Sequence, residues 1–467
     1  MGLPIISSKK AQANSVLAAN TIAFTACFAV WVIFSIIGIP IKELLELSES
    51  QFGLLVATPI LTGSILRLPV GMLTDRIGGR IVFFLLILTM IIPLWLIGDA
   101  TKYWHFLALG LLIGVAGSAF SVGIAYTSKW YDNKNQGLVM GIFGAGNAGA
   151  ALTKFIAPTI VVVYGWQTVP KVYAVAMIIV LALYWMFTYE DPSHISSSQV
   201  SFKEQIKALS DPKLWKYMQY YSLVFGGFVA LSLWMTKYYI VEYGIDLRTA
   251  ALLAAIFVLP SGVIRALGGW FADKYGAYKV TWYVMWTSLV CLFFMSYPQT
   301  TLVISTTHGP EDFDISLNIW IFTVILFILG IAWGFGKASV FKFLSDEYSE
   351  NIGVVSGAVG LAGGMGGFLL PIMFGVIIDY THINSSIFML LYGATAVSLV
   401  WMHFTFEKEY IEGMVKKEKR KVLDEYIKLQ DDHDSVISAK AIMEHMDLLE
   451  EFNSKYNAYK DSIKNTK

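Results

Sequence analysis

Residues 67–80 read RLPVGMLTDRIGGR, and residues 265–279 read RALGGWFADKYGAYK. The second stretch repeats the first at an offset of 198 residues, from 67 to 265, with an Arg, a Gly and an Asp at matching places. The stretch GLVMGIFGAGN, from residue 137, recurs as GVVSGAVGLAG from residue 353, an offset of 216. Repeats of this kind predict a chain that is built from two duplicated halves.

The composition predicts a membrane protein. Of the 467 residues, 56% are hydrophobic and only 15% are charged, and the mean hydropathy is +0.60. A water-soluble globule of this composition would expose large apolar patches. About twelve apolar stretches, each near the length that crosses a ~30 Å hydrocarbon core, lie between about residue 17 and about residue 404.

The longest polar connection before the C-terminal tail, residues 190–213, separates the first six of these stretches from the last six. We therefore expect an all-α membrane protein whose transmembrane helices form two pseudo-symmetric six-helix halves. The expected domains are an N-terminal half at 1–189, a cytoplasmic linker at 190–213, a C-terminal half at 214–404 and a cytoplasmic helical tail at 405–467.

The charged loops predict the orientation in the membrane. The first span follows Lys9 and Lys10 and has no small-residue cleavage site, so it is expected to be retained rather than removed as a signal peptide. The basic turns DRIGGR and DKYGAYK fall on the side of the N-terminus, whereas the acidic loop KELLELSES, residues 42–50, falls on the other. We expect a multi-pass protein of the cytoplasmic (inner) membrane with both termini in the cytoplasm. Cys27 and Cys291 lie inside apolar spans and are assigned to packing, and no cofactor or metal is expected.

Two arginines are predicted to lie deep in the membrane. Arg67 comes two helical turns before Asp75, and Arg265 has the same position in the other half. No acidic residue lies at comparable depth nearby in the sequence, so an anion is expected to neutralise the two charges. A guanidinium offers a planar fork of donors that suits a small oxyanion. The alternative is that backbone carbonyls or polar groups of each half satisfy the arginines.

Glycines recur at helical spacing in the second repeat and are expected to form sliding helix faces. These faces are expected to pack across the pathway against helices of the opposite half. Asn147 lies among the glycines, and its amide can donate to an oxyanion that a carboxylate would repel. The alternative is that Asn147 bonds a neighbouring helix. The glycines are Gly141, Gly144, Gly146 and Gly149 in the first half, and Gly357, Gly360, Gly363 and Gly364 in the second.

The loop GMLTDRIGGR resembles the cytoplasmic motif of the major facilitator superfamily, and the resemblance in topology covers nearly the whole chain except the tail. It implies the major facilitator fold, with a substrate held near the midplane between two rocking halves. In such a loop Asp75 can cap a helix N-terminus across the interface while Arg76 and Arg80 stay in water. This gating loop, with its counterpart Asp273, would be a latch that rocking must break.

The glycine helices resemble the signature motifs of the NarK-type nitrate/nitrite porters within that superfamily. They match as GxxGxGNxG and GxxGLAGGMGG. By this resemblance Arg67 and Arg265 would clamp nitrate or nitrite and Asn147 would hydrogen-bond it. Matching positions suggest Tyr221 as a hydroxyl donor and Phe120 as an aromatic wall, although both side chains could equally serve packing.

Several lysines are also expected at membrane depth: Lys154, Lys337 and Lys342, with Lys237 nearer a span end. The run GKASVFK resembles the branch of the family that couples nitrate to protons. Lys337 and Lys154 are therefore candidate proton carriers, since burial among cations favours loss of a proton. The alternative is that these lysines only make the pathway more positive.

The expected function is secondary active transport by alternating access, with nitrate, and also nitrite, as the anion and import driven by protons. The alternatives are a nitrate/nitrite antiporter that extrudes nitrite, a carrier for another small anion, and an ion channel. No metalloprotease motif, Ser/His/Asp arrangement or Cys/His cluster indicates an enzyme. The expected partners are the anion, protons and the lipid bilayer, with no nucleic acid, and the protein is expected to be a monomer.

Overall fold

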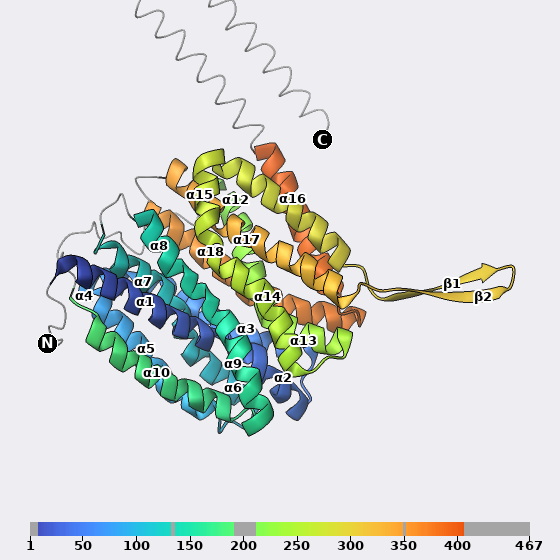
Figure 1. The fold of residues 1–467 in the computed structure, drawn as a ribbon, viewed down its shortest axis with the longest axis horizontal. Coiled ribbons are helices and arrows are strands. Elements are labelled where there is room, and N and C mark those ends of the chain that lie inside the picture. Colours follow the sequence, from blue (N-terminus) through green and yellow to red (C-terminus); the bar gives the residue numbers. More distant parts are fainter. Residues whose placement is uncertain (1–7, 132–135, 191–211, 349–351, 406–467) are drawn as a thin grey trace, which may run out of the picture. The chain divides into compact units, whose positions relative to one another are not determined.

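The computed structural model describes residues 8–131, 136–190, 212–348 and 352–405, and these are largely helical apart from one β-hairpin (Figure 1). Most of the predicted linker and tail lies outside the described residues. The described residues up to 399 belong to one compact unit, and the last described residues, 400–405, fall in a second unit.

The N-terminal half contains ten α-helices and two short 3-10 segments among the described residues. They are α1 (Lys9–Trp31), α2 (Phe34–Leu44), α3 (Glu49–Ile65), α4 (Arg67–Ile77), α5 (Gly79–Ile97), α6 (Tyr103–Ile113), η1 (Gly114–Ser118), α7 (Ala119–Ser128), α8 (Gln136–Gly144), η2 (Ala145–Ala148), α9 (Gly149–Tyr164) and α10 (Thr168–Phe187).

The C-terminal half begins with a helix that is interrupted by a π-helical turn. This half also includes the hairpin. Its elements are α12 (Pro212–Tyr221), η3 (Ser222–Gly226), α13 (Gly227–Tyr243), α14 (Leu247–Val263), α15 (Arg265–Tyr275), α16 (Ala277–Met295), β1 (Thr300–Thr306), β2 (Gly309–Ile315), α17 (Ile319–Glu347), α18 (Ile352–Thr381) and a last helix at Ser386–Thr405.

Within the described residues, eleven helical spans are long and apolar enough to cross a membrane. A further pair, Leu247–Val263 with Leu267–Tyr275, is bent by 51° and counts as the twelfth if it forms one span. The prediction of a helical membrane fold is confirmed, and the predicted twelve spans are reached when the bent pair is included. Several spans are interrupted helices; α1 and α2, for example, together form one span, Lys9–Leu44.

The predicted duplication is visible in the backbone. Helices α3, α4 and α5 have 17, 11 and 19 residues, and so do α14, α15 and α16. The matching turns contain Gly78 with φ +92° and Gly276 with φ +90°, a conformation that glycine adopts without a steric penalty. The repeated sequence therefore gives a repeated set of breaks and turns.

The N-termini of α3 and α14 are capped at matching positions. The Ser48 hydroxyl accepts from the Gln51 N–H at 3.2 Å, and the Gln51 side chain accepts from the Ser48 N–H at 2.9 Å, which is a capping box. The Asp246 carboxylate accepts from the N–H groups of Arg248 and Thr249 at 2.9 and 3.1 Å. Hydrogen bonds from Thr249 lower the pKa of the Asp246 carboxyl.

The hairpin was not predicted from the sequence. Strands β1 and β2 pair antiparallel, from Thr300 opposite Ile315 to Thr306 opposite Gly309. The hairpin projects away from the helices, and its side chains are mostly exposed (Figure 1). Its sequence has no clean apolar alternation because no face of the hairpin is buried in a core.

Candidate functional site

Arg67 lies where the helix of the second span is interrupted. Leu66 separates α3 from α4, and Arg67 begins α4 with only 6% of its surface exposed. Its Nη1 donates to the Gly360 carbonyl of α18, in the opposite half, at 3.0 Å. Its Nη2 lies 3.5 Å from the Gly117 carbonyl of η1. The guanidinium therefore reaches the interface between the two halves.

Arg265 has the equivalent place in the C-terminal half. Ile264 separates α14 from α15 with nearly the same backbone angles as Leu66, φ −69° and ψ −9° against φ −72° and ψ −12°. A Cβ added to Gly144, in the other half, would lie 3.9 Å from the Arg265 Cδ. The structure thus brings both predicted arginines to the same interface.

Phe120 lies between the two guanidinium groups. The Cζ of Arg67 is 5.8 Å from the centroid of its ring, and the Cζ of Arg265 is 5.4 Å from it. Both distances allow a cation–π interaction. The expected aromatic wall is therefore in contact range of both arginines.

Three more aromatic rings link the arginines on another side. Phe225 lies 5.7 Å from the Cζ of Arg67 and stacks on Tyr221 at 5.1 Å. Tyr221 meets Phe341 edge to face at 5.0 Å, and Phe341 lies 5.5 Å from the Cζ of Arg265. We call the two arginines with Phe120, Tyr221, Phe225 and Phe341 the arginine site.

The arginine site has positive charge without a compensating carboxylate. Among the described residues, neither Arg67 nor Arg265 forms a salt bridge. In the same part of the chain, the buried Nε of Arg67 and the buried Nη1 of Arg265 have no hydrogen-bond partner. Buried donors are rarely left unpaired in native proteins, so these two N–H groups are available to an acceptor.

Asn147 lies in η2, close to this interface. Its Nδ2 donates to the Gly144 carbonyl at 2.8 Å, and the residue is 2% exposed. The bond is local rather than to a neighbouring helix. A Cβ on Gly262 of α14 would lie 3.4 Å from the Asn147 carbonyl carbon, so the opposite half packs directly on this backbone. Because an amide has two N–H donors, one hydrogen bond leaves the other free for a ligand.

Three of the four predicted glycines of α18 pack against the opposite half. A Cβ on Gly357 would lie 2.9 Å from Leu68, one on Gly360 would lie 3.5 Å from the Arg67 Nη1, and one on Gly364 would overlap Ser64. Gly363 packs on Tyr221 of its own half.

The prediction was wrong for two glycines of the first half. Gly146 packs against Phe24 and Gly149 against the backbone at Thr25, both on α1 of the same half. The opposite half instead approaches η2 through Gly262 of α14. A glycine pattern predicts close helix contact, but it does not identify the neighbouring helix.

Lys337 and Lys154 are buried, and no acidic partner is found for either among the described residues. The Nζ of Lys337 donates to the Ser261 hydroxyl at 3.0 Å and lies 3.5 Å from the centroid of the Phe228 ring. Ser261 is one helical turn before Arg265. The Nζ of Lys154, on α9, donates to the Ser232 carbonyl of α13 at 2.7 Å and therefore crosses between the halves.

The predicted loop residues do not all behave as expected. Arg80 was predicted to stay in water, but it is 5% exposed and donates to the Trp185 carbonyl at 2.7 Å. Its Cζ also lies 4.1 Å from the Trp185 ring. Arg80 is buried because its guanidinium pairs with a backbone carbonyl near the C-terminal end of α10. Arg76 is exposed, and the side chain of Asp75 lies outside the part of the chain that the structure describes.

Lys342 was predicted at membrane depth but lies toward the end of α17. Its Nζ pairs with Asp273 at 3.2 Å and with Asp346 at 2.9 Å. Asp273, the predicted counterpart of Asp75 in the gating loop, is thus paired within its own half.

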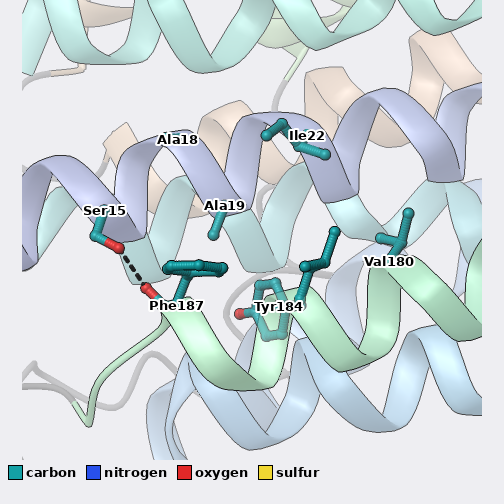
Figure 2. Close-up of a pocket in the computed structure, with 8 residues that line it drawn as sticks. Ser15, Ala18, Ala19, Ile22, Val180, Tyr184 and Phe187 are labelled. Atoms are coloured by element: carbon teal, nitrogen blue, oxygen red, sulfur yellow. Dashed lines mark hydrogen bonds between the residues drawn. The ribbon is translucent and has the colours of Figure 1, made fainter. Parts of the chain in front are cut away.

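A pocket of about 200 Å³ lies apart from the arginine site, between α1 and α10 (Figure 2). Ser15 and Phe187 close one end of it, where the Ser15 hydroxyl donates to the Phe187 carbonyl at 2.7 Å. None of the eight described residues that line the pocket is charged. Its apolar lining does not suit a small anion.

Phe225 and Phe341 were missed by sequence reasoning. Phe225 follows Tyr221 by four residues, a spacing that places side chains together on a helix. Phe341 follows Lys337 by four residues, in the run GKASVFK, where a function was predicted only for the lysines. The π-helical turn η3 after Tyr221 was also missed; such turns occur frequently at functional sites.

One family model and several known proteins match most of this chain. A family model described as Major Facilitator Superfamily matches residues 20–371. The probable nitrate/nitrite antiporter NarK1 of Thermus thermophilus is 35% identical, over 84% of this chain and 91% of that protein. The nitrite extrusion protein of Bacillus subtilis is 29% identical, over 83% and 94%. The probable nitrate transporter NarT of Staphylococcus aureus is 30% identical, over 86% and 98%.

A solved structure shows the same fold. The crystal structure of a bacterial homolog of the human lysosomal transporter Spinster, in an inward-facing and occupied conformation, matches with a TM-score of 0.61. The match covers 85% of this chain and 94% of that one at 16% identity, so it supports the fold alone.

Proposed function

Because the chain belongs to the major facilitator superfamily and, within it, to the NarK-type nitrate/nitrite porters, we propose that it carries nitrate and nitrite across the membrane by alternating access. One observation supports this most strongly. Arg67 and Arg265 come from opposite halves to the same Phe120 ring, with unpaired N–H groups and without a carboxylate partner among the described residues. Because the chain belongs to a transporter family, the alternative that it is a membrane enzyme is excluded.

The chemistry of the arginine site suits a small planar oxyanion. Each guanidinium can donate two parallel hydrogen bonds in one plane, and nitrate and nitrite have their oxygens in one plane. The rings of Phe120, Phe225 and Phe341 place apolar surface beside the guanidinium groups, so the attraction between anion and guanidinium is stronger than it would be in solvent. We propose that Asn147 supplies a further, uncharged donor, and that Tyr221 acts through its hydroxyl.

Binding of the anion would favour closure of the two halves. Without an anion, Arg67 and Arg265 repel each other across the interface. An anion between them is attracted to both guanidinium groups. This attraction is stronger in the closed state, where both groups lie near the anion, than in the open state, so the anion favours closure. The Arg67 bond to the Gly360 carbonyl already joins the N-terminal half to α18 of the other half.

We propose that import is driven by protons and that Lys337 carries the proton. Lys337 is completely buried and hydrogen-bonds the hydroxyl of Ser261, which lies one helical turn before Arg265. Lys154, the other candidate, is also buried but bridges to α13. An anion that enters against an inside-negative potential costs ~2.3 kcal/mol per 100 mV, so the potential drives it inward only if more than one proton accompanies each anion.

Exchange of nitrate for nitrite is the second candidate. The names of two relatives, a probable nitrate/nitrite antiporter and a nitrite extrusion protein, favour it. In that case Lys337 would remain charged and would only contribute to the positive potential of the pathway.

Purified protein in liposomes distinguishes these proposals. Uptake of labelled nitrate is measured with an inside-alkaline pH gradient, and separately with nitrite inside and no gradient. Accumulation that follows the gradient supports proton symport, whereas uptake that requires internal nitrite supports exchange. If neither condition gives saturable uptake, the substrate proposal fails.

We propose a monomer in the cytoplasmic membrane with both termini in the cytoplasm, in contact with the lipid bilayer. The exposed Arg76 and the basic turns at 78 and 276 support this orientation by the positive-inside rule. The arginine site is formed by one chain, so it requires no second copy.

A further inference from the structure

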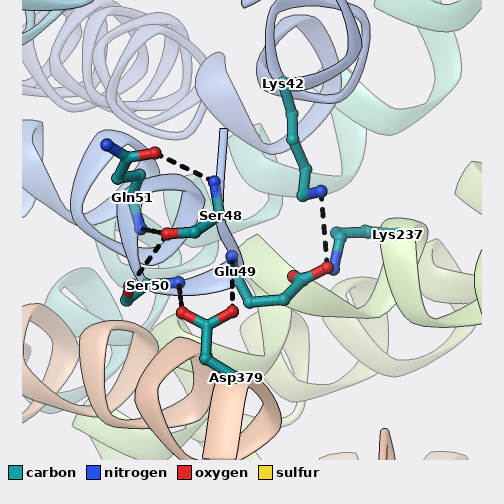
Figure 3. Close-up of polar contacts among 7 residues, drawn as sticks. All are labelled: Lys42, Ser48, Glu49, Ser50, Gln51, Lys237 and Asp379. Atoms are coloured by element: carbon teal, nitrogen blue, oxygen red, sulfur yellow. Dashed lines mark hydrogen bonds and ion pairs between the residues drawn. The ribbon is translucent and has the colours of Figure 1, made fainter. Parts of the chain in front are cut away.

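A second charged cluster joins the two halves at the end of the helices opposite the turns at 78 and 276. The carboxylate of Asp379, near the C-terminus of α18, accepts from the backbone N–H groups of Glu49 and Ser50 at 2.9 Å each (Figure 3). Both N–H groups belong to the first turn of α3, in the other half. The first N–H groups of a helix have no partner within the helix and attract negative charge. Asp379 therefore caps a helix of the opposite half.

The side chain of Glu49 makes a second link. It pairs with Lys237 of α13, in the C-terminal half, and lies 3.4 Å from Lys42 of α2 (Figure 3). The Lys237 side chain is only 6% exposed, and its Nζ also lies 5.2 Å from the Phe52 ring of α3. Two charges of the C-terminal half thus contact the first turn of α3.

The backbones of α3 and α18 touch beside these charges. A Cβ on Gly375 would lie 2.5 Å from the Ser50 Cα, and one on Gly53 would lie 3.1 Å from the Ile372 Cα. Such contacts leave no space for water between the two helices. The contact between α3 and α18 is therefore closed at this end of the arginine site.

We propose that Asp379 and the Glu49–Lys237 pair form an outer latch, which holds this end closed and must release before an anion can enter from this side. The proposal rests on the alternating access inferred above.

The latch differs from ordinary helix capping in what it joins. Asp246 also accepts two backbone N–H groups, but these belong to α14 of its own half. Loss of Asp246 would weaken one helix end and leave the contact between halves intact. It is therefore the matched control for Asp379.

The test uses a cysteine that only outer opening would expose. Cys27 and Cys291 are buried and would be replaced by alanine, and Ile60→Cys would be added. Ile60 is completely buried between the latch and Arg67, and a Cβ on Gly367 of α18 would lie 3.3 Å from its Cγ2. Its rate of reaction with a water-soluble maleimide, on purified protein in detergent, measures opening at this end.

We expect Asp379→Asn and Lys237→Gln each to raise that rate by about tenfold or more, and Asp246→Asn to leave it unchanged. Rates within about twofold of the parent in both latch variants would overturn the proposal. A similar rise in Asp246→Asn would also overturn it, because any lost cap would then have the same effect. If one latch variant does not fold, the other still decides.

Nitrate binding separates this proposal from the proposed function. Asp379→Asn keeps every residue of the arginine site, so calorimetry should show that it still binds nitrate. If the parent protein binds no nitrate, the proposed function fails. The labelling experiment then still decides the latch, because it uses no substrate.

Discussion

Replacing Arg265 by lysine keeps the positive charge of the arginine site but removes its planar fork of donors. The buried Nη1 of Arg265 has no partner among the described residues, so it is free to donate to an anion. The lysine ammonium is a point charge with a different donor geometry. We expect nitrate to lose at least one charge-assisted hydrogen bond in Arg265→Lys.

The size of the effect follows from that bond. A hydrogen bond to a charged group contributes about 1.5–3 kcal/mol, and 1.4 kcal/mol is a factor of ten, so nitrate should bind about 10- to 150-fold more weakly. The contact with Phe341, 5.5 Å from the Cζ, would weaken as well. Transport should fall accordingly, while the fold remains intact because no carboxylate partner is described for Arg265.

Titration calorimetry on purified protein measures this change directly. Arg80→Lys is the control, since Arg80 is also buried but bonds the Trp185 carbonyl within the N-terminal half. It should keep the affinity for nitrate even if thermal stability falls. Binding by Arg265→Lys within about threefold of wild type would show that the Arg265 guanidinium does not bind nitrate, since it corresponds to less than one such bond.

Three further predictions concern other parts of the molecule. Asn147→Ala should weaken nitrate binding by about 1–2 kcal/mol in calorimetry without unfolding the protein, and Asn147→Asp should bind less still; an aspartate variant of full affinity would argue against a direct contact. Lys337→Gln should retain anion exchange in liposomes but lose accumulation driven by a pH gradient, and full pH-driven accumulation would exclude it as the proton carrier. Gly375→Ala should lower the free energy of unfolding by about 1–3 kcal/mol, because its Cβ would meet the Ser50 backbone, whereas Gly393→Ala, with nothing within 4 Å, should not.

Repetition made much of the fold predictable. The matching stretches at 67 and 265 fold into helices of equal length with the same break and the same glycine turn. A duplicated sequence meets the same local sterics twice, so both arginines begin a helix at the same interface. The sequence also showed that no acidic residue lies at comparable depth near either arginine. Because a charge buried in an apolar span needs a partner, this absence predicted an anion as the ligand.

Contacts between distant residues could not be predicted in the same way. Asp379 bonds the Glu49 N–H across 330 positions, and neither residue belongs to a repeated motif. Phe341 is one of many aromatic residues, and only its neighbours distinguish it from a packing residue. Arg80 was misplaced because the motif identifies a loop, whereas its burial depends on the Trp185 carbonyl and ring at the end of α10.

We propose that a single anion is held by arginines from both halves. Calorimetric titration of nitrate into the wild type, Arg67→Lys, Arg265→Lys and the double variant tests it most directly. We expect one nitrate per chain, a loss of affinity of at least about tenfold in each single variant, and a combined loss that is not additive, since both arginines share one ligand. Two nitrates per chain, or a single variant that keeps the wild-type affinity, would contradict it.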